Sequence, residues 1–285
     1  MNDRRSLDGV FKAIERLSAI GVLLTSVEML SKSKHFNDTG LMSWPVSRLY
    51  RIDTTRGKLP QILKPFVSYP AINGVIVLRL LAALFLLTNR RGKRARTAAV
   101  AGIAASSVML SARSPYGLDG ADQMITITFL TVLIARLRSG SAFVQQVCLW
   151  FLALQSCLSY ITAGVAKAFG SMWSDGTAMS GILGTNQYGN RAVGQFLQKH
   201  PKLAIWSGKG VTFWESVFPV VLILPRPISD LFVWSGAAFH LGIALTMGLN
   251  DFLWAFVATY PAILFCSEET TSVLGKLLLL KRKRF

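Results

Sequence analysis

The chain has 285 residues, of which 52% are hydrophobic and only 16% are charged. Soluble domains carry about 25% charged residues, so the composition predicts an integral membrane protein, with residues 1–285 forming one membrane domain. The net charge is +17, but the sequence has no groove-entering motif and no interleaving of aromatic and basic residues. Nucleic-acid binding is therefore not expected, and the lipid bilayer is the expected partner of this basic surface.

Apolar runs of about 20 residues, the length needed to cross the hydrocarbon core of a bilayer, recur along the whole chain. They predict an all-α fold: a polytopic membrane bundle of about eight transmembrane helices, with a long external loop between the fifth and sixth helices. The expected spans, in chain order, are residues 10–30, 69–88, 97–112, 122–137, 142–168, 203–224, 230–248 and 251–267.

Basic residues orient these spans. The segments 89–97 and 281–285 and the pair Arg136 and Arg138 predict a multi-pass protein of the cell membrane with both termini in the cytoplasm. No cleaved signal peptide is expected, since charged residues interrupt the first apolar run. The basic segment 31–68 would then lie outside. Two interpretations stand: this segment lies on the membrane surface, or the first span does not cross and the protein has six or seven spans.

The predicted spans contain ionisable residues, among them Arg79, Lys209, Glu215 and His240, while Glu28, Arg16 and Lys167 lie near span ends. Such groups are costly in lipid and usually face a bundle interior, a cavity or a partner. Glu215 is expected either to pair with Arg79 or Lys209 or to have a functional role. Lys209 is expected to reach the membrane surface with its charged end. His240 is either a hydrogen-bonded core residue or a functional one.

The stretch SYITAGVAKAFGSMWSDGTAM, residues 159–179, ends the fifth predicted span with a lysine. On a helix, Tyr160, Gly164 and Lys167 share one face, and Gly164 allows another helix or a ligand to come close. Lys167 lies at the outer end of this span, beneath the loop 170–202, which can fold back as a lid. A lysine partly removed from water can lose its proton and act as a base. Alternatively, Lys167 reaches the membrane surface or pairs with Asp175.

Other chemistry has little support. The three histidines lack the spacing of metal ligands, so no metal site is predicted. No phosphate-binding glycine motif is present. The three cysteines all lie in apolar runs without a CxxC pair, and we expect them to be small buried hydrophobic residues: Cys148, Cys157 and Cys266.

Residues 159–179 resemble the signature of the membrane domain of the vitamin K-dependent γ-carboxylase and its bacterial relatives, the HTTM family. The matching residues are Tyr160, Ala163, Gly164, Lys167, Trp173 and Gly176. Further similar blocks, in the order found in the family, are 213-FWESVFPVVLILPR-226, 239-FHLGIALTMGLNDF-252 and 116-YGLDGADQM-124.

This resemblance implies that Lys167 is a base that deprotonates a hydroquinone, with His240 and Glu215 beside it in the catalytic site. It also implies a quinone-type cofactor and substrate contacts from Tyr160, Gly164, Trp173 and Asp119.

The sequence departs from the carboxylase at residues 119–124, where the carboxylase has an Asn-His pair and this chain has no histidine. The carboxylase also has a large lumenal domain after its membrane part, whereas this sequence ends soon after its last predicted span. Vitamin K-driven carboxylation of glutamate is therefore not expected. The chain is closer to compact bacterial members, among them the membrane component of the sporulation-delaying toxin maturation system, which acts on a secreted peptide precursor with a small partner protein.

Two functions remain open at this point. The first is a membrane-embedded enzyme or peptide-maturation factor that uses Lys167 as a base in a cavity near the external face. The second is a non-enzymatic membrane protein (a partner, immunity or transport component) in which the same polar residues only hold helices together. Sharing a fold with an enzyme does not decide between them.

Overall fold

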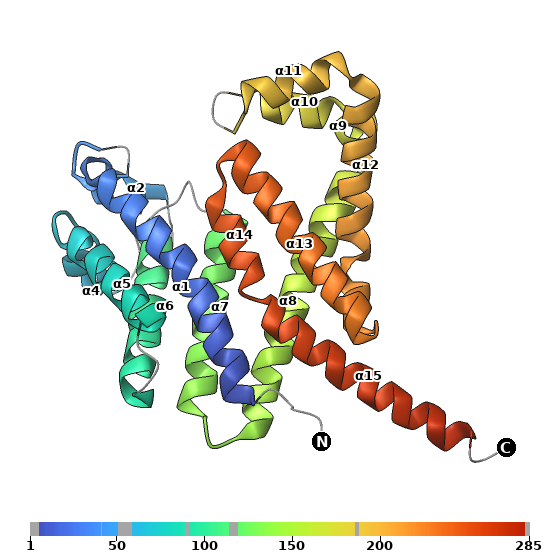
Figure 1. Cartoon of the computed structure of the whole chain (residues 1–285). Helices are drawn as coiled ribbons and strands as arrows, with labels where there is room; N and C mark the ends of the chain where they lie inside the picture. Colours follow the sequence, from blue (N-terminus) through green and yellow to red (C-terminus); the bar gives the residue numbers. More distant parts are fainter. Residues whose placement is uncertain are drawn as a thin grey trace. The chain divides into compact units, whose positions relative to one another are not determined.

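The structure is a computed structural model that describes residues 6–40, 42–50, 59–88, 92–113, 119–185 and 188–282. All regular structure in these ranges is helical (Figure 1), as predicted. The chain forms two compact units, residues 1–148 and 149–285, and each is described by itself. The boundary falls within one helix, α8 (Ala142–Ala168), which begins in the first unit and continues in the second.

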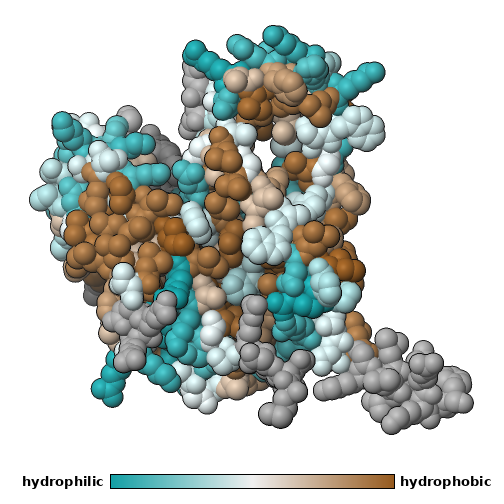
Figure 2. All heavy atoms as spheres, in the orientation of Figure 1, coloured by the Kyte–Doolittle hydropathy of each residue, from teal (hydrophilic) through white to brown (hydrophobic). Residues whose placement is uncertain are grey.

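Five helices of the described part are long and apolar enough to cross a membrane: α5 (Ala71–Thr88), α6 (Lys93–Arg113), α7 (Gly120–Leu137), α8 and α13 (Arg226–Met247). Several of their large apolar side chains are exposed, including Leu78 and Leu81 of α5. In Figure 2 hydrophobic residues gather over the region of α5. Exposed apolar surface of this extent is costly in water but not in lipid. The chain is therefore an integral membrane protein with several membrane-spanning helices.

The first unit is built around α1, α5, α6 and α7, joined by short helical segments. α1 (Leu7–Ser31) packs against α5 and α7, and α6 lies between α5 and α7 in chain order and contacts both. The segments that precede α5 are η1 (Ser33–Phe36), α2 (Trp44–Ser47), η2 (Arg48–Tyr50) and α4 (Leu59–Val67). A small apolar core of Phe36, Ile72, Ile76 and Leu110 ties η1 to α5 and α6.

Arg113, the last residue of α6, is fully buried and fixes these short segments in place. Its guanidinium donates hydrogen bonds to the backbone carbonyls of Val67 and Phe36, both at 2.7 Å, and to that of Met42. It also lies 5.0 Å from the centroid of the Phe36 ring. A buried charge is tolerated only when it is fully hydrogen-bonded, and here carbonyls from three separate segments meet that need.

The second unit contains the remainder of α8 and the helices that follow it. These are α9 (Ser171–Ser174), α10 (Thr177–Gly184), α11 (Arg191–Lys199), α12 (Pro201–Val217), η3 (Phe218–Leu222), α13, α14 (Asn250–Val257) and α15 (Tyr260–Arg282). α13 ends at Gly248, whose φ of +73° is the left-handed conformation that stops a helix at low cost in glycine.

The segment 170–202, predicted as a long loop, is helical over most of its described part. Asn190 accepts hydrogen bonds from Ala192 N and Val193 N and so begins α11. Leu183, Leu197 and Ala204 form a small apolar core, on which Met247 at the end of α13 also packs. α10 and α11 therefore cover this end of α13, with hydrophilic residues along their outer edge (Figure 2). The described part of this segment thus consists mostly of packed helices and not of an irregular loop, and its role as a lid stays a prediction.

The predicted single span 251–267 is wrong in its continuity, since α14 ends at Val257 and α15 begins at Tyr260. The cause is Pro261. Proline has no backbone N–H and its ring blocks the preceding helical turn, so it is accommodated in the first turn of a new helix. The same effect ends α12 at Val217, two residues before Pro219, so that the predicted span 203–224 finishes as the short helix η3.

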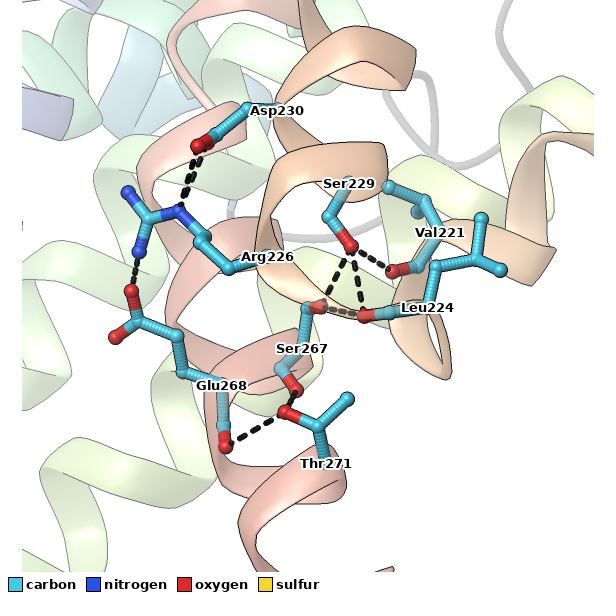
Figure 3. A network of polar contacts seen from close by, with 8 residues as sticks. All are labelled: Val221, Leu224, Arg226, Ser229, Asp230, Ser267, Glu268 and Thr271. Atoms are coloured by element: carbon cyan, nitrogen blue, oxygen red, sulfur yellow. Dashed lines mark hydrogen bonds and ion pairs between the residues drawn. The ribbon is translucent and has the colours of Figure 1, made fainter.

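A polar network joins the start of α13 to α15 and the end of η3 (Figure 3). The Ser229 hydroxyl lies 2.8 Å from the Ser267 hydroxyl and donates toward the carbonyls of Val221 and Leu224, both at 3.0 Å. Beside it, the Arg226 guanidinium contacts Asp230 at 2.8 Å and pairs with Glu268. These contacts satisfy backbone carbonyls freed where η3 ends.

Candidate functional site

The centre of the candidate site is an ion pair between α8 and α12. Lys167, in the last turn of α8, has its Nζ 2.6 Å from Glu215 Oε2 in α12. The Glu215 side chain is 6% exposed and that of Lys167 is 20% exposed. The carboxylate is therefore enclosed by protein, while the lysine retains a path to the surface of the unit.

Trp173 of α9 closes one side of this pair. Its ring centroid lies 5.2 Å from Lys167 Nζ, within the range in which an aromatic face attracts a cation. The sequence predicted Trp173 at the same site as Lys167, and the structure brings the two together. The ammonium thus lies between a carboxylate and an indole.

The partner of Glu215 differs from the expected ones. Glu215 pairs with Lys167, whereas Arg79, one expected partner, donates to Ser106 and Ser107 within the first unit. Lys209, the other expected partner, is exposed with its Nζ 5.8 Å from the Trp206 ring centroid.

Asp175 is not the partner of Lys167. It accepts hydrogen bonds from the backbone N–H and the hydroxyl of Thr177, which hold the pKa of its carboxyl below the ordinary value.

Gly164 brings the two helices close enough for the ion pair to form. A Cβ built at this position would lie 2.5 Å from Ser216 Oγ, 2.6 Å from Ser216 N and 3.0 Å from Thr212 O. Since no side chain fits there, α8 and α12 touch through backbone one turn from Lys167. The predicted close approach at Gly164 is confirmed, and the neighbour is α12.

Gly176 has a similar role beside the site. Its φ of +82° is left-handed, and a Cβ there would lie 2.5 Å from Ile205 Cγ1 and 2.9 Å from the Ile205 backbone. Only glycine meets both requirements without strain. It therefore sets the turn between α9, which carries Trp173, and α10.

A second polar group lies on the same face of α8, two turns before Lys167. The Tyr160 hydroxyl is 2.7 Å from His240 Nε2 and 2.7 Å from the Tyr260 hydroxyl. All three residues are buried. His240 Nδ1 is buried with no hydrogen-bond partner among the described residues. His240 is therefore hydrogen-bonded at one nitrogen and available at the other.

Aromatic rings enclose this chain of hydroxyl and imidazole groups. The Tyr160 ring lies 4.0 Å from Phe218 and 5.3 Å from Trp214, centroid to centroid, and the His240 ring stacks on Phe256 at 4.6 Å. The surroundings exclude water, which strengthens hydrogen bonds and raises the cost of an unsatisfied polar atom.

Tyr260 was not predicted as a site residue. Its only signal in the sequence is its place before Pro261, where α14 gives way to α15. That break turns the first residue of α15 toward the site. Trp214 was also not predicted as a site residue. It lies next to Glu215 in sequence, and its ring packs against Tyr160 and Phe218.

Asp119, predicted as a substrate contact, lies in the first unit, where it caps α7. Its carboxylate accepts hydrogen bonds from Ala121 N at 2.9 Å and Asp122 N at 3.1 Å. This is the ordinary role of aspartate at the start of a helix. Its predicted contact with substrate stays a prediction, and residues 116–118 of the same block lie outside the described part of the chain.

The arrangement suits proton transfer. A lysine and a carboxylate at 2.6 Å are joined by one hydrogen bond, along which a proton can pass between them. An amine that has given up its proton can accept one from a weak acid. Within the described ranges no three His, Cys, Asp or Glu side chains lie close enough together to hold a metal ion.

Comparisons with known proteins give no relative: no protein-family model, no curated protein and no solved structure matches this chain.

Proposed function

We propose that this membrane protein is a member of the HTTM family, with eight transmembrane helices, and that its second unit is a membrane-embedded enzyme or peptide-maturation factor that deprotonates a quinol-type substrate. The Lys167–Glu215 pair carries the proposal. Lys167 Nζ lies 2.6 Å from the Glu215 carboxylate, and the resemblance assigns this lysine as the base.

The proton steps balance as follows. In the resting pair the proton lies on Nζ. Its transfer to Glu215 leaves a neutral amine and a neutral carboxylic acid. The substrate hydroxyl then gives its proton to Nζ, which produces an ammonium and a substrate oxyanion held next to it. Glu215 is the temporary proton holder, and Trp173 covers the ammonium formed at the end.

Tyr160 and His240 assist at the other end of the same face. The hydroxyl–imidazole chain presents one unpaired nitrogen, His240 Nδ1, which suits hydrogen bonding to an oxygen of a flat, apolar ligand. The aromatic rings around it suit stacking on such a ligand.

The proposal is tested by the absorption spectrum of a soluble menaquinol analogue added to the full chain in detergent, kept under nitrogen. Quinol anions absorb at longer wavelength than neutral quinols. The wild-type protein is expected to produce the anion band. Lys167→Arg keeps the positive charge but cannot give up its proton, so it is expected to bind the analogue without the band. An equal band with Lys167→Arg would contradict a base at this position.

The second candidate is a non-enzymatic membrane protein, and one observation favours it. Lys167 and Glu215 satisfy each other at a helix crossing fixed by Gly164, as expected of a pair that only ties α8 to α12. The exchange Lys167→Glu with Glu215→Lys separates the two functions. A tie between helices tolerates the exchange, whereas a base aimed at a ligand does not.

A further inference from the structure

We propose that the first unit holds a binding site for a phosphate oxyanion at an arginine cluster formed by Arg96 and Arg136 around Glu15. This site is independent of the Lys167 site and of the function proposed for it.

The cluster has more positive charge than its carboxylate can neutralise. Glu15 Oε2 accepts from Arg96 Nη2 at 2.6 Å and Arg96 Nε at 3.1 Å, and Glu15 Oε1 accepts from Arg136 Nε. The Glu15 side chain is 0% exposed, that of Arg96 3% and that of Arg136 9%. Two guanidinium groups thus share one carboxylate, and the buried group has an excess charge of +1 before any neighbour is counted.

The two arginines are used differently. Arg96 is well occupied, because besides Glu15 it donates from Nη1 to the carbonyl of Leu86 at 3.1 Å. Arg136 meets Glu15 only through Nε, and its Nη2 is buried with no hydrogen-bond partner among the described residues. An unpaired, buried charged donor is costly. A hydrogen-bond acceptor at Arg136 Nη2 would therefore stabilise the cluster.

The geometry of the Arg136 guanidinium indicates which kind of ligand would bind. The two terminal nitrogens of a guanidinium form a planar fork that matches two oxygens of a phosphate or carboxylate. Among the described residues, Glu15 is the one carboxylate that forms an ion pair with Arg136. A phosphate oxyanion would satisfy the fork and neutralise the excess charge together.

The position in the unit agrees with such a ligand. Arg136 is in the last turn of α7, Arg96 in the first turn of α6, and Leu86 near the end of α5. Figure 1 shows these ends of α5, α6 and α7 at the same end of the unit. The ends of membrane-spanning helices lie at the level of lipid headgroups. A further exposed basic residue, Lys93, lies at the start of α6 and would attract an anion.

The source of the phosphate is either an anionic phospholipid headgroup or free phosphate, and the experiment separates them. The full chain is purified in detergent, and its thermal unfolding is followed with added phosphatidylglycerol, phosphatidylcholine, sodium phosphate or sodium chloride at matched ionic strength. We expect phosphatidylglycerol to raise the Tm and chloride to leave it unchanged. A rise with sodium phosphate of the same size would assign the site to free phosphate. No rise with any phosphate compound would overturn the proposal.

Variants tie the effect to the site. Arg136→Gln is expected to weaken the apparent affinity for the phosphate compound by about tenfold, since it removes a charge-assisted hydrogen bond. Arg138→Gln, an exposed arginine two residues along, is the matched control and is expected to bind as the wild type does. Equal losses in the two variants would show general charge attraction and contradict a built site.

Glu15→Gln is a second variant that tests the site if Arg136→Gln does not fold. It removes the competing carboxylate, so the phosphate-induced rise in Tm is expected to be larger than in the wild type, even where the ligand-free Tm falls. A purely structural cluster predicts no such increase. An unchanged or smaller rise would therefore count against the site.

Discussion

Gly164 and Lys167 lie one turn apart on α8. The close contact of Gly164 with α12 allows Lys167 to form its ion pair with Glu215. A Cβ at Gly164 would lie 2.6 Å from the backbone nitrogen of Ser216, the residue that follows Glu215. Because the two helices touch through backbone here, the side chain of Lys167 reaches Glu215 at 2.6 Å.

Substitutions at this crossing test that relationship. Gly164→Leu is expected to destabilise the protein by about 3 kcal/mol or more, because overpacking at a backbone contact forces the helices apart. Ala163→Leu, at the neighbouring half-exposed position, is expected to change the free energy of unfolding by less than about 1 kcal/mol. Unfolding in a denaturing detergent measures both. Equal stability of the two variants would contradict the contact.

The ion pair itself can be tested with a double-mutant cycle. Lys167→Met leaves the Glu215 carboxylate buried without a partner, and is expected to cost about 2–3 kcal/mol, somewhat less than for a fully buried pair because Lys167 is partly exposed. The double variant with Glu215→Leu is expected to recover most of that loss, since apolar replacement of both partners is often neutral. Additive losses in the two single variants would show that the residues do not interact.

Helix positions and the crossing at Gly164 were predictable because they depend on local pattern. Runs of apolar residues set α5 to α8 within a few residues, and a glycine next to a polar face in a membrane helix indicated close packing. The partner of Glu215 was not predictable in this way, since it depends on which helix lies across the crossing.

Two other features were missed for definable reasons. The helices of segment 170–202 are rich in glycine and asparagine, which argue against helix in an isolated sequence; Asn190 is in fact a cap and not an interruption. In the first unit, Glu15 made α1 an uncertain span, because an isolated carboxylate is costly in lipid. The structure shows that Arg96 and Arg136 neutralise the charge of Glu15. Even Arg96, the nearer of the two in sequence, is 81 residues away from Glu15.

Arg113 is expected to hold the short segments before α5. Arg113→Leu leaves the carbonyls of Phe36, Met42 and Val67 without their donor, at about 1–3 kcal/mol for each buried group left unsatisfied. The loss should be local. Limited proteolysis and hydrogen exchange in residues 33–50 are expected to increase, while α13 stays protected. Lys64→Leu, at an exposed position of α4, is the control, and equal exchange in both variants would contradict this role.

Among the described residues, the Tyr160 hydroxyl has two hydrogen-bond partners, His240 and Tyr260, whereas the Tyr260 hydroxyl has one, Tyr160. Tyr160→Phe is therefore expected to destabilise the protein more than Tyr260→Phe, by about 2–3 against about 1 kcal/mol, because it leaves both His240 Nε2 and Tyr260 without their partner. Thermal unfolding of the two variants compares these losses. A larger loss in Tyr260→Phe would contradict Tyr160 as the central member of the chain.

The orientation of α8 in the membrane is the last prediction. Basic residues before α8, Arg136 and Arg138, predict that its first end faces the cytoplasm, so that α11 lies outside. Ser139 and Gln195 are both exposed and lie on either side of α8 in the chain. In intact cells, Gln195→Cys is expected to react with a membrane-impermeant maleimide, and Ser139→Cys only after the cells are opened. The natural cysteines Cys148, Cys157 and Cys266 are buried and free, so the unmodified chain measures the background. Reaction of Ser139→Cys from outside, with Gln195→Cys protected, would reverse the topology, and equal reaction of both would show that α8 does not cross.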